Sequence, residues 1–115
     1  MKTLAKTTLI QNEREAIEVA VEKLKTKFPV DKIILFGSKV RGDSDKHSDI
    51  DLLIITSHPL HWKDEKVIVE ELFDIGLEYD VIFSPLFASN SEWESDLFLQ
   101  MPVYQEIIKD GAIIT

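Results

Sequence analysis

The hydrophobic positions of this chain fall into short runs and periodic segments that predict alternating strands and helices. Two short apolar runs, at 33–36 and 52–55, are bounded by polar residues, which indicates two buried strands joined by a loop. Similar patterns predict a third strand at 77–83 and an edge strand at 112–114. We therefore expect a small β-sheet built from separated parts of the chain.

Segments with apolar residues three and four positions apart predict helices that pack on this sheet. They lie at 15–28, 63–75, 91–97 and 103–109. Asn12 and Glu15 have the spacing of a capping box for the first helix, and Gly76 is expected to end the second. Towards the C-terminus we expect Trp93, Phe98 and Tyr104 to be packing residues, although one of them could stack on a base. The pattern as a whole predicts one α/β domain over residues 1–115, with a small mixed sheet and flanking helices.

Residues 1–11 show only weak patterning, so we expect either a flexible N-terminal arm or an ordered extension. The chain has 115 residues, 44% of them hydrophobic, and no cysteine, which excludes disulfides and thiolate metal sites. No run approaches the roughly 20 apolar residues of a membrane span, and the N-terminus lacks the apolar stretch of a signal peptide. A cytoplasmic protein without a membrane partner is the expectation.

The charge of the chain limits the partners that it can bind. Thirteen basic and twenty-one acidic residues give a net charge of −8, and no basic stripe is present. Proteins that grip a nucleic-acid backbone usually have the opposite balance, so we expect no direct binding of nucleic acid. A nucleotide accompanied by metal ions remains compatible with an acidic surface, because the ions carry positive charge.

Two aspartates open the second apolar run. Side chains alternate along a strand, so Asp49 and Asp51 share one face, with Cα atoms about 6.5–7 Å apart, while Ile50 points into the core. That spacing allows two carboxylates to converge on one divalent cation or on a pair of cations. It is also compatible with a solvated strand start, since Asp is common beside loops.

Gly37 and Ser38 follow the first apolar run directly. A glycine there allows a sharp turn and close approach of the backbone to a ligand, and the serine offers a hydroxyl and an N–H to phosphate oxygens. The same pair also fits an ordinary turn. Neither a Walker motif nor a dinucleotide-binding glycine fingerprint is present.

The polar loop between the two strands contains two cations, Lys39 and Arg41, and either could meet nucleotide phosphates. Other polar residues of this loop are expected only to solvate it: Asp43, Asp45 and His47. Beyond the second strand, His58 and His61 lie three positions apart, but no cysteine or further histidine completes a metal site, so we interpret them as structural.

Taken together, Gly37-Ser38, ten intervening residues and Asp49-x-Asp51 match the G-S-x10-D-x-D signature of minimal nucleotidyltransferases. These enzymes belong to the DNA polymerase β-like nucleotidyltransferase superfamily, and Arg41-Gly42 matches a pair that the family often carries in this loop. The chain thus resembles this superfamily along nearly its whole length, and the resemblance implies its fold.

The resemblance also implies a site. The phosphates of a nucleoside triphosphate, ATP by expectation, would dock on Gly37 and Ser38, with Arg41 as a further phosphate contact. Asp49 and Asp51 would hold two Mg²⁺ ions. The family also has a third carboxylate on the neighbouring strand, which is assigned to Asp80; it would bind the ion on the side of the nucleophile and help to deprotonate the acceptor hydroxyl.

Within the predicted third strand, Glu78 is the alternative to Asp80, since both share a strand face. We prefer Asp80 because it precedes Val-Ile-Phe directly, as Asp51 precedes Leu-Leu-Ile.

The acceptor is implied only by resemblance. Stand-alone minimal nucleotidyltransferases are typically antitoxins of HEPN-domain ribonuclease toxins, and some attach AMP to a toxin tyrosine. We therefore expect a protein adenylyltransferase with a HEPN toxin as its partner. Two alternatives stay open: an antitoxin that neutralises by binding alone, and a transferase that modifies a small molecule such as an aminoglycoside.

Overall fold

The computed structural model describes residues 2–3, 9–42 and 48–114, with the side chains of residues 2–3 left aside. The strands are β1 (Lys2–Thr3), β2 (Val30–Phe36), β3 (Ile50–Thr56), β4 (Phe83–Ser89) and β5 (Ala112–Ile113). The helices are α1 (Gln11–Lys27), α2 (Ser38–Arg41), α3 (Trp62–Tyr79), α4 (Asn90–Trp93), α5 (Asp96–Leu99) and α6 (Pro102–Asp110). This arrangement confirms the predicted α/β class with a mixed sheet.

The five strands form one sheet in the order β1-β5-β2-β3-β4. β2 runs antiparallel to both β3 and β5, whereas β4 runs parallel to β3 and β1 parallel to β5. In the central pair, Phe36 at the end of β2 is the partner of Asp51 near the start of β3. The segment that links Phe36 to Asp51 therefore begins and ends at the same end of the β2–β3 pair. The parallel pair β3–β4 needs a crossover, and α3 provides it.

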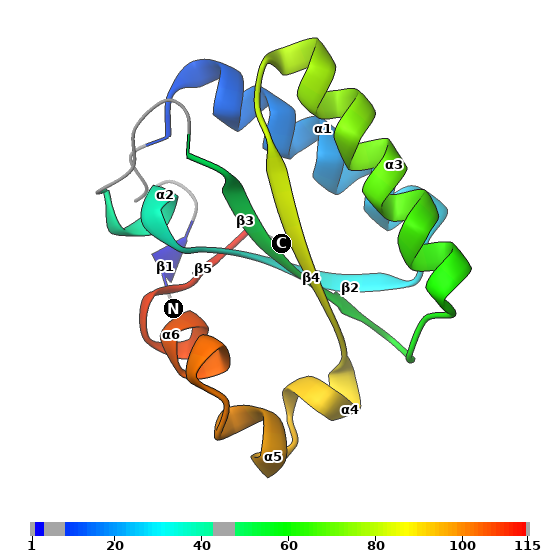
Figure 1. Ribbon diagram of the computed structural model, residues 1–115, viewed down its shortest axis with the longest axis vertical. Coiled ribbons are helices and arrows are strands. Elements are labelled where there is room, and N and C mark those ends of the chain that lie inside the picture. Colours follow the sequence, from blue (N-terminus) through cyan, green and yellow to red (C-terminus); the bar gives the residue numbers. More distant parts are fainter. Residues whose placement is uncertain (1, 4–8, 43–47, 115) are drawn as a thin grey trace.

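Helices cover both faces of the sheet (Figure 1). α1 and α3 lie on one face, where they pack on Ile50, Leu52 and Ile54 of β3. The opposite face of β3 carries Leu53 and Ile55, which pack with Tyr104 and Ile107 of α6. Because both faces of β3 are buried, its sequence is almost continuously apolar. The two aspartates therefore stand out at its start.

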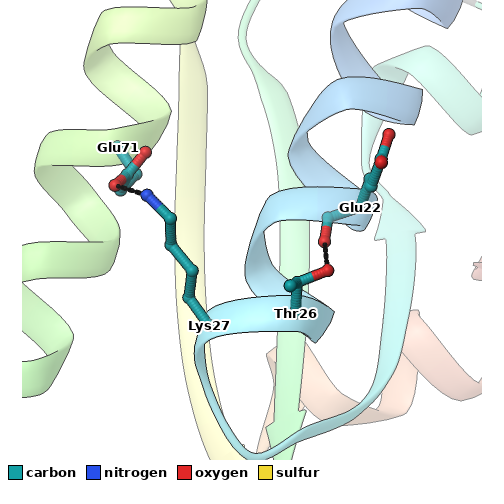
Figure 2. Close-up of polar contacts among 4 residues, drawn as sticks. All are labelled: Glu22, Thr26, Lys27 and Glu71. Carbon is teal, nitrogen blue, oxygen red and sulfur yellow. Dashed lines mark hydrogen bonds and ion pairs between the residues drawn. The ribbon is translucent and has the colours of Figure 1, made fainter.

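α1 and α3 lie side by side over their shared face (Figure 1). Near the end of α1, the Lys27 Nζ lies 2.7 Å from the Glu71 Oε1 of α3 (Figure 2). The hydrogen bond from Lys27 lowers the pKa of Glu71. One residue earlier, the Thr26 hydroxyl donates to the Glu22 carbonyl over 2.7 Å (Figure 2). An ion pair as exposed as Lys27–Glu71 stabilises the packing only slightly.

The start of α1 differs from the prediction. The helix begins at Gln11, and the Glu13 side chain accepts the backbone N–H of Ile10 over 3.0 Å, so the expected box of Asn12 and Glu15 is wrong. The Asn12 amide instead donates to the Tyr79 carbonyl at the end of α3, again over 3.0 Å. Asn12 thus joins the start of α1 to the end of α3 and does not cap its own helix.

The end of α3 also lies beyond the predicted residue. Gly76 is inside the helix, and a Cβ atom there would lie 2.5 Å from the Val81 carbonyl oxygen. The helix continues to Tyr79, and Asp80 ends it in the left-handed conformation (φ 58, ψ 48). Gly76 is thus needed for close approach of the chain that leaves the helix, and Asp, which tolerates this conformation better than most residues, forms the cap.

Two strand predictions are corrected as a consequence. The predicted strand 77–83 is wrong, because 77–79 complete α3 and β4 starts at Phe83. β5 is not at a sheet edge, because Lys2–Thr3 pairs on its outer side. The expected arm thus includes β1, while residues 1 and 4–8 of it lie outside the described part of the chain.

The aromatic residues near the C-terminus have the predicted packing role. The Tyr104 ring lies 4.8 Å from that of Phe98 and 6.1 Å from that of Trp93, between centroids. Burial raises the pKa of Tyr104, and the nearby Glu92 adds to the effect.

Among the helices of the described residues, none is both long and apolar enough to cross a membrane.

Candidate active site

The two aspartates of the signature lie at the entrance of β3. Asp49 is exposed and immediately precedes the strand, whereas Asp51 is its second residue and is half-buried. Phe36 pairs with Asp51, so the residue after Phe36, Gly37, lies at the end of β2 beside the start of β3. The turn after β2 and the acidic entrance of β3 are therefore neighbours.

Gly37 contacts Asp51 so closely that no other residue fits. Its backbone (φ 81, ψ −155) lies in a region that is essentially restricted to glycine. A Cβ atom built there would overlap with the Asp51 Oδ2 and lie 3.2 Å from its Cγ. The helix α2 starts at the next residue, Ser38, and the Arg41 amide donates to the Gly37 carbonyl over 3.2 Å. The turn thus holds its backbone directly against one carboxylate.

The surroundings of Asp51 disfavour its charge. Partial burial raises the pKa of its carboxyl group, the neighbouring Asp49 raises it further, and Arg41 opposes both. Two carboxylates that share one face and repel each other are a suitable binding site for a cation. Arg41 thus acts on the Asp51 carboxyl group as a nearby positive charge.

This electrostatic cost leads to a stability prediction for Asp51→Asn. A folded-state pKa above the usual range means that the folded chain binds this proton more tightly than the unfolded chain, so ionisation of Asp51 destabilises the fold. Without metal at neutral pH, the variant should melt a few degrees higher than wild type, and the gain should vanish below about pH 3, where Asp is protonated in both states. Calorimetry across this pH range checks the sign, and equal melting temperatures at neutral pH would contradict it.

The two loop cations have different positions. The Lys39 side chain is only 3% exposed, and its Nζ lies 2.5 Å from the Glu13 Oε2 of α1. Glu13 uses its other oxygen, Oε1, for the Ile10 amide. Lys39 thus anchors α2 to the start of α1, whereas the exposed Arg41 is the better candidate for a phosphate. The other loop residues considered, Asp43, Asp45 and His47, lie outside the described residues.

Sequence reasoning did not identify Glu13 as part of this region. Its only signal was an acidic residue in the first helical turn, which also fits a solvated helix start. Burial of both partners depends on how α1 crosses the sheet, and the local pattern does not contain that information. The ion pair ties the Gly37–Ser38 turn to α1 across 26 positions of sequence.

Asp80 was predicted to lie on the strand beside β3, and this prediction is wrong. It caps α3, is exposed, and precedes β4 by three residues. The residue of β4 that pairs with Asp51 is Ser84. Across the described part of the chain, no three Asp, Glu or His side chains come together as a metal-binding group. The three-carboxylate cluster is therefore not assembled here.

Asp80 nevertheless lines a cleft beside the start of β3. The cleft has a volume of about 370 Å³, and its walls come from the start of α1, Ser48 and the segment from Asp80 to Ile82. The Ile50 amide donates to the Ile82 carbonyl over 2.8 Å, which fixes this segment beside the start of β3. Asp80 therefore stands on the wall of a cavity that reaches the residue before Asp49.

The two histidines have a structural role, as predicted. The His61 side chain accepts the Lys63 amide over 3.2 Å and thereby caps α3. The His58 ring pairs with the neighbouring Ser57 hydroxyl. Both lie at the opposite end of β3 from the aspartates, because the chain enters this segment after Thr56.

Comparison with known proteins places these features in a family. The family model described as "Nucleotidyltransferase domain" matches residues 17–113, which include the Gly37–Ser38 turn and both aspartates. The chain belongs to the nucleotidyltransferase domain family. In this nucleotidyltransferase the Gly37–Ser38 turn, the pair of Asp49 and Asp51, and Arg41 all lie at the same end of the central strands β2 and β3.

Two relatives come from Methanocaldococcus jannaschii. "Putative protein adenylyltransferase MJ0141" is 39% identical over 57 residues, half of this chain, and the match spans 58% of the relative's length. The protein MJ0604, with the same designation, is 29% identical over 105 residues, which cover 90% of this chain and 98% of the relative.

A solved structure shares the fold. A crystal structure of a mutant toxin–antitoxin pair, MntA–HpeT, aligns with 92% of this chain and 73% of the matched chain. The TM-score is 0.56 and the sequence identity is 19%. At this identity the likeness concerns the fold, and it agrees with the polymerase β-like arrangement that the sequence predicts.

Proposed function

We propose that this nucleotidyltransferase moves AMP from ATP, with Mg²⁺, onto a hydroxyl group of a protein. One observation carries the proposal: Gly37 lies directly against the carboxylate of Asp51. Triphosphate oxygens held by the Gly37–Ser38 turn would thereby lie within reach of ions held by the acidic pair. The two relatives designated protein adenylyltransferases support AMP and a protein acceptor.

The residues present fit Mg²⁺. This ion prefers oxygen ligands, is commonly bound through one or two carboxylates, and takes its remaining ligands from substrate phosphates and water. Asp49 and Asp51 supply two carboxylates whose mutual repulsion a cation would relieve. When bound, Mg²⁺ would neutralise the charge that develops on the phosphates.

The proposed reaction is an in-line displacement. The acceptor hydroxyl oxygen bonds to the α-phosphorus, the bond from that phosphorus to the oxygen bridging the β-phosphate breaks, and pyrophosphate leaves. Ser38 and Arg41 would orient the phosphates. The hydroxyl proton would pass to a carboxylate on the acceptor side, for which Asp80 on the cleft wall is our candidate.

Asp80→Asn tests that assignment. Asn adopts the left-handed conformation as readily as Asp, so the cap of α3 should be kept. Because Asp80 stands apart from the acidic pair, we expect transfer to fall by about 10²-fold and to remain measurable, as for loss of a general base. Initial rates with saturating ATP check this. A loss as complete as that of Asp49→Asn would instead place Asp80 among the metal ligands.

We further propose that the acceptor is a tyrosine of a HEPN-domain toxin, so that the chain acts as an antitoxin. The support is the fold likeness to a toxin–antitoxin pair together with the family resemblance carried by the signature residues. The net charge of −8 favours a basic partner protein and disfavours nucleic acid as the acceptor.

Capture of the tagged chain from its source cells tests this part of the proposal. We expect a HEPN-domain protein to be recovered with it, with AMP on a tyrosine, and we expect the modification to be missing with Asp49→Asn/Asp51→Asn. If that double variant neutralises the toxin as well as wild type does, neutralisation is by binding alone. Transfer onto an aminoglycoside by the isolated chain would point to the small-molecule alternative.

A further inference from the structure

The second half of α3 carries a stripe of apolar side chains that no other described element covers. Val69, Phe73 and Leu77 follow one another at four-residue steps, so they lie on one side of the helix. They are 44%, 65% and 69% exposed. Phe73 is thus exposed, whereas Ile68, Leu72 and Ile75 of the same helix are buried.

This stripe forms one wall of a groove, which we call the α3–β4 groove. Its other wall comes from Ile82, Phe83 and Pro85 at the start of β4, and its volume is about 460 Å³. Ile82 is 61% exposed. Side chains as exposed as these form an open apolar surface, whereas small-molecule sites enclose most of their ligand. The groove therefore suits a protein segment.

The charges around the groove have a single sign. Between residues 67 and 80 the chain carries five acidic residues and no basic one. Glu71 is paired with Lys27 of α1, but Glu70, Asp74 and Glu78 are exposed, each next in sequence to a residue of the stripe. A segment that buries apolar side chains here would gain from lysine or arginine on its flanks.

The groove adjoins the cleft beside the start of β3. The residues from Asp80 to Ile82 line both the groove and the cleft, which also includes Ser48, one position before Asp49. A segment seated in the groove would thus lie beside the start of the strand that carries Asp51. This position links the surface to the candidate active site.

The edge strand beside the groove disfavours a strand as the occupant. The Ile50 amide donates to the Ile82 carbonyl, so in the parallel ladder the backbone groups of Phe83 and Pro85 point away from β3. Pro85 has no N–H to donate, so it interrupts the outer edge where an added strand would pair. A helix laid into the groove needs no such backbone bonds.

We propose that the α3–β4 groove binds an amphipathic helix of the acceptor protein, with its apolar residues against Phe73, Leu77 and Ile82 and its basic residues towards Glu70 and Asp74. This proposal rests on the proposed function, because it describes how that acceptor is held. It assigns recognition to a surface separate from the nucleotide turn.

The test uses a fluorescein-labelled 16-residue peptide with leucine at helical spacing i, i+3, i+4, i+7 and lysine elsewhere, titrated with the full chain and followed by anisotropy. We expect saturable binding that falls at least about tenfold in Phe73→Ser/Leu77→Ser. Glu70→Gln/Asp74→Asn should weaken binding and reduce its salt dependence. The matched control is Leu97→Ser on α5, an apolar residue that is 71% exposed, which should bind like wild type.

Several outcomes would overturn the proposal. They are no binding by wild type, equal binding by Phe73→Ser/Leu77→Ser, or equal binding of a peptide with the same composition in scrambled order. Sedimentation adds a further one: if wild type dimerises and Phe73→Ser/Leu77→Ser is monomeric, a second copy occupies the groove. Asp49→Asn/Asp51→Asn should bind the peptide normally, so failure of the groove and failure of the transfer reaction are distinguishable.

Discussion

Asp49→Asn should abolish Mg²⁺-dependent nucleotidyl transfer, with a loss of at least about 10³-fold, while the fold remains intact. Asn keeps the size of the side chain but removes the charge that would hold a cation at the entrance of β3. Asp49 is exposed and outside both apolar cores, so its replacement costs no packing. Initial rates with ATP and Mg²⁺, together with a melting curve, measure the two effects separately.

Glu18→Gln is the matched control for this variant. Glu18 is also an exposed carboxylate, but it lies on α1, where it lines neither the cleft nor the α3–β4 groove. Its neutralisation changes the net charge by the same amount and should leave the rate near that of wild type. A rate for Asp49→Asn close to that of Glu18→Gln would remove Asp49 from the site.

Gly37→Ala should be the most damaging single change in the turn. Its backbone conformation costs about 1–3 kcal/mol for a residue with a Cβ atom, and that atom would overlap with the Asp51 carboxylate. The turn or Asp51 must therefore move. We expect a lower melting temperature and, in the protein that still folds, a loss of transfer of about 10²-fold or more, because misplacement by about 1 Å can cost that much.

Gly111→Ala separates the folding effect from the effect on the site. A Cβ atom at Gly111 would press on the Ile107 carbonyl and lie 2.9 Å from the Ile34 Cγ2, so this variant should also be destabilised. Its neighbours belong to β2 and α6 and not to the acidic pair. Below its melting temperature, Gly111→Ala should transfer AMP at nearly the wild-type rate. If Gly37→Ala does the same, the contact with Asp51 has no catalytic role.

The central part of the site could be predicted from sequence because its geometry is local. Alternation along a strand puts Asp49 and Asp51 on one face, and a glycine directly after an apolar run indicates a turn with close contacts. The structure confirms the two strands and shows Gly37 against Asp51. Each of these inferences spans only a few residues, so the periodicity of the strand was sufficient.

The position of Asp80 could not be predicted because glycine has two uses at a helix end. Gly76 had the position of a C-terminal cap, but the helix needs it for close approach of Val81, and Asp80 takes the left-handed conformation instead. The helix ends at Tyr79, four residues after its predicted end at residue 75. β4 starts at Phe83, six residues after the predicted start of that strand at residue 77. Because Gly76 was taken as the end of the helix, Asp80 was wrongly assigned to the following strand.

Contacts between distant segments were the other part that the sequence did not reveal. The buried pair of Glu13 and Lys39 and the exposure of Phe73 both depend on how helices cross the sheet. A charged residue in a helix or a loop is usually solvated, and an aromatic residue at helical spacing is usually buried. Both usual expectations failed here.

Nucleotidyl transfer at the entrance of β3 can be tested by label transfer from ATP carrying a radioactive α-phosphate, with Mg²⁺, into a lysate of the source cells. A reaction with γ-labelled ATP and one with Asp49→Asn/Asp51→Asn run beside it. We expect a protein band labelled only from the α-position and only by wild type. A band labelled from the γ-position, an α-label that persists in the double variant, or the absence of any labelled band would contradict it.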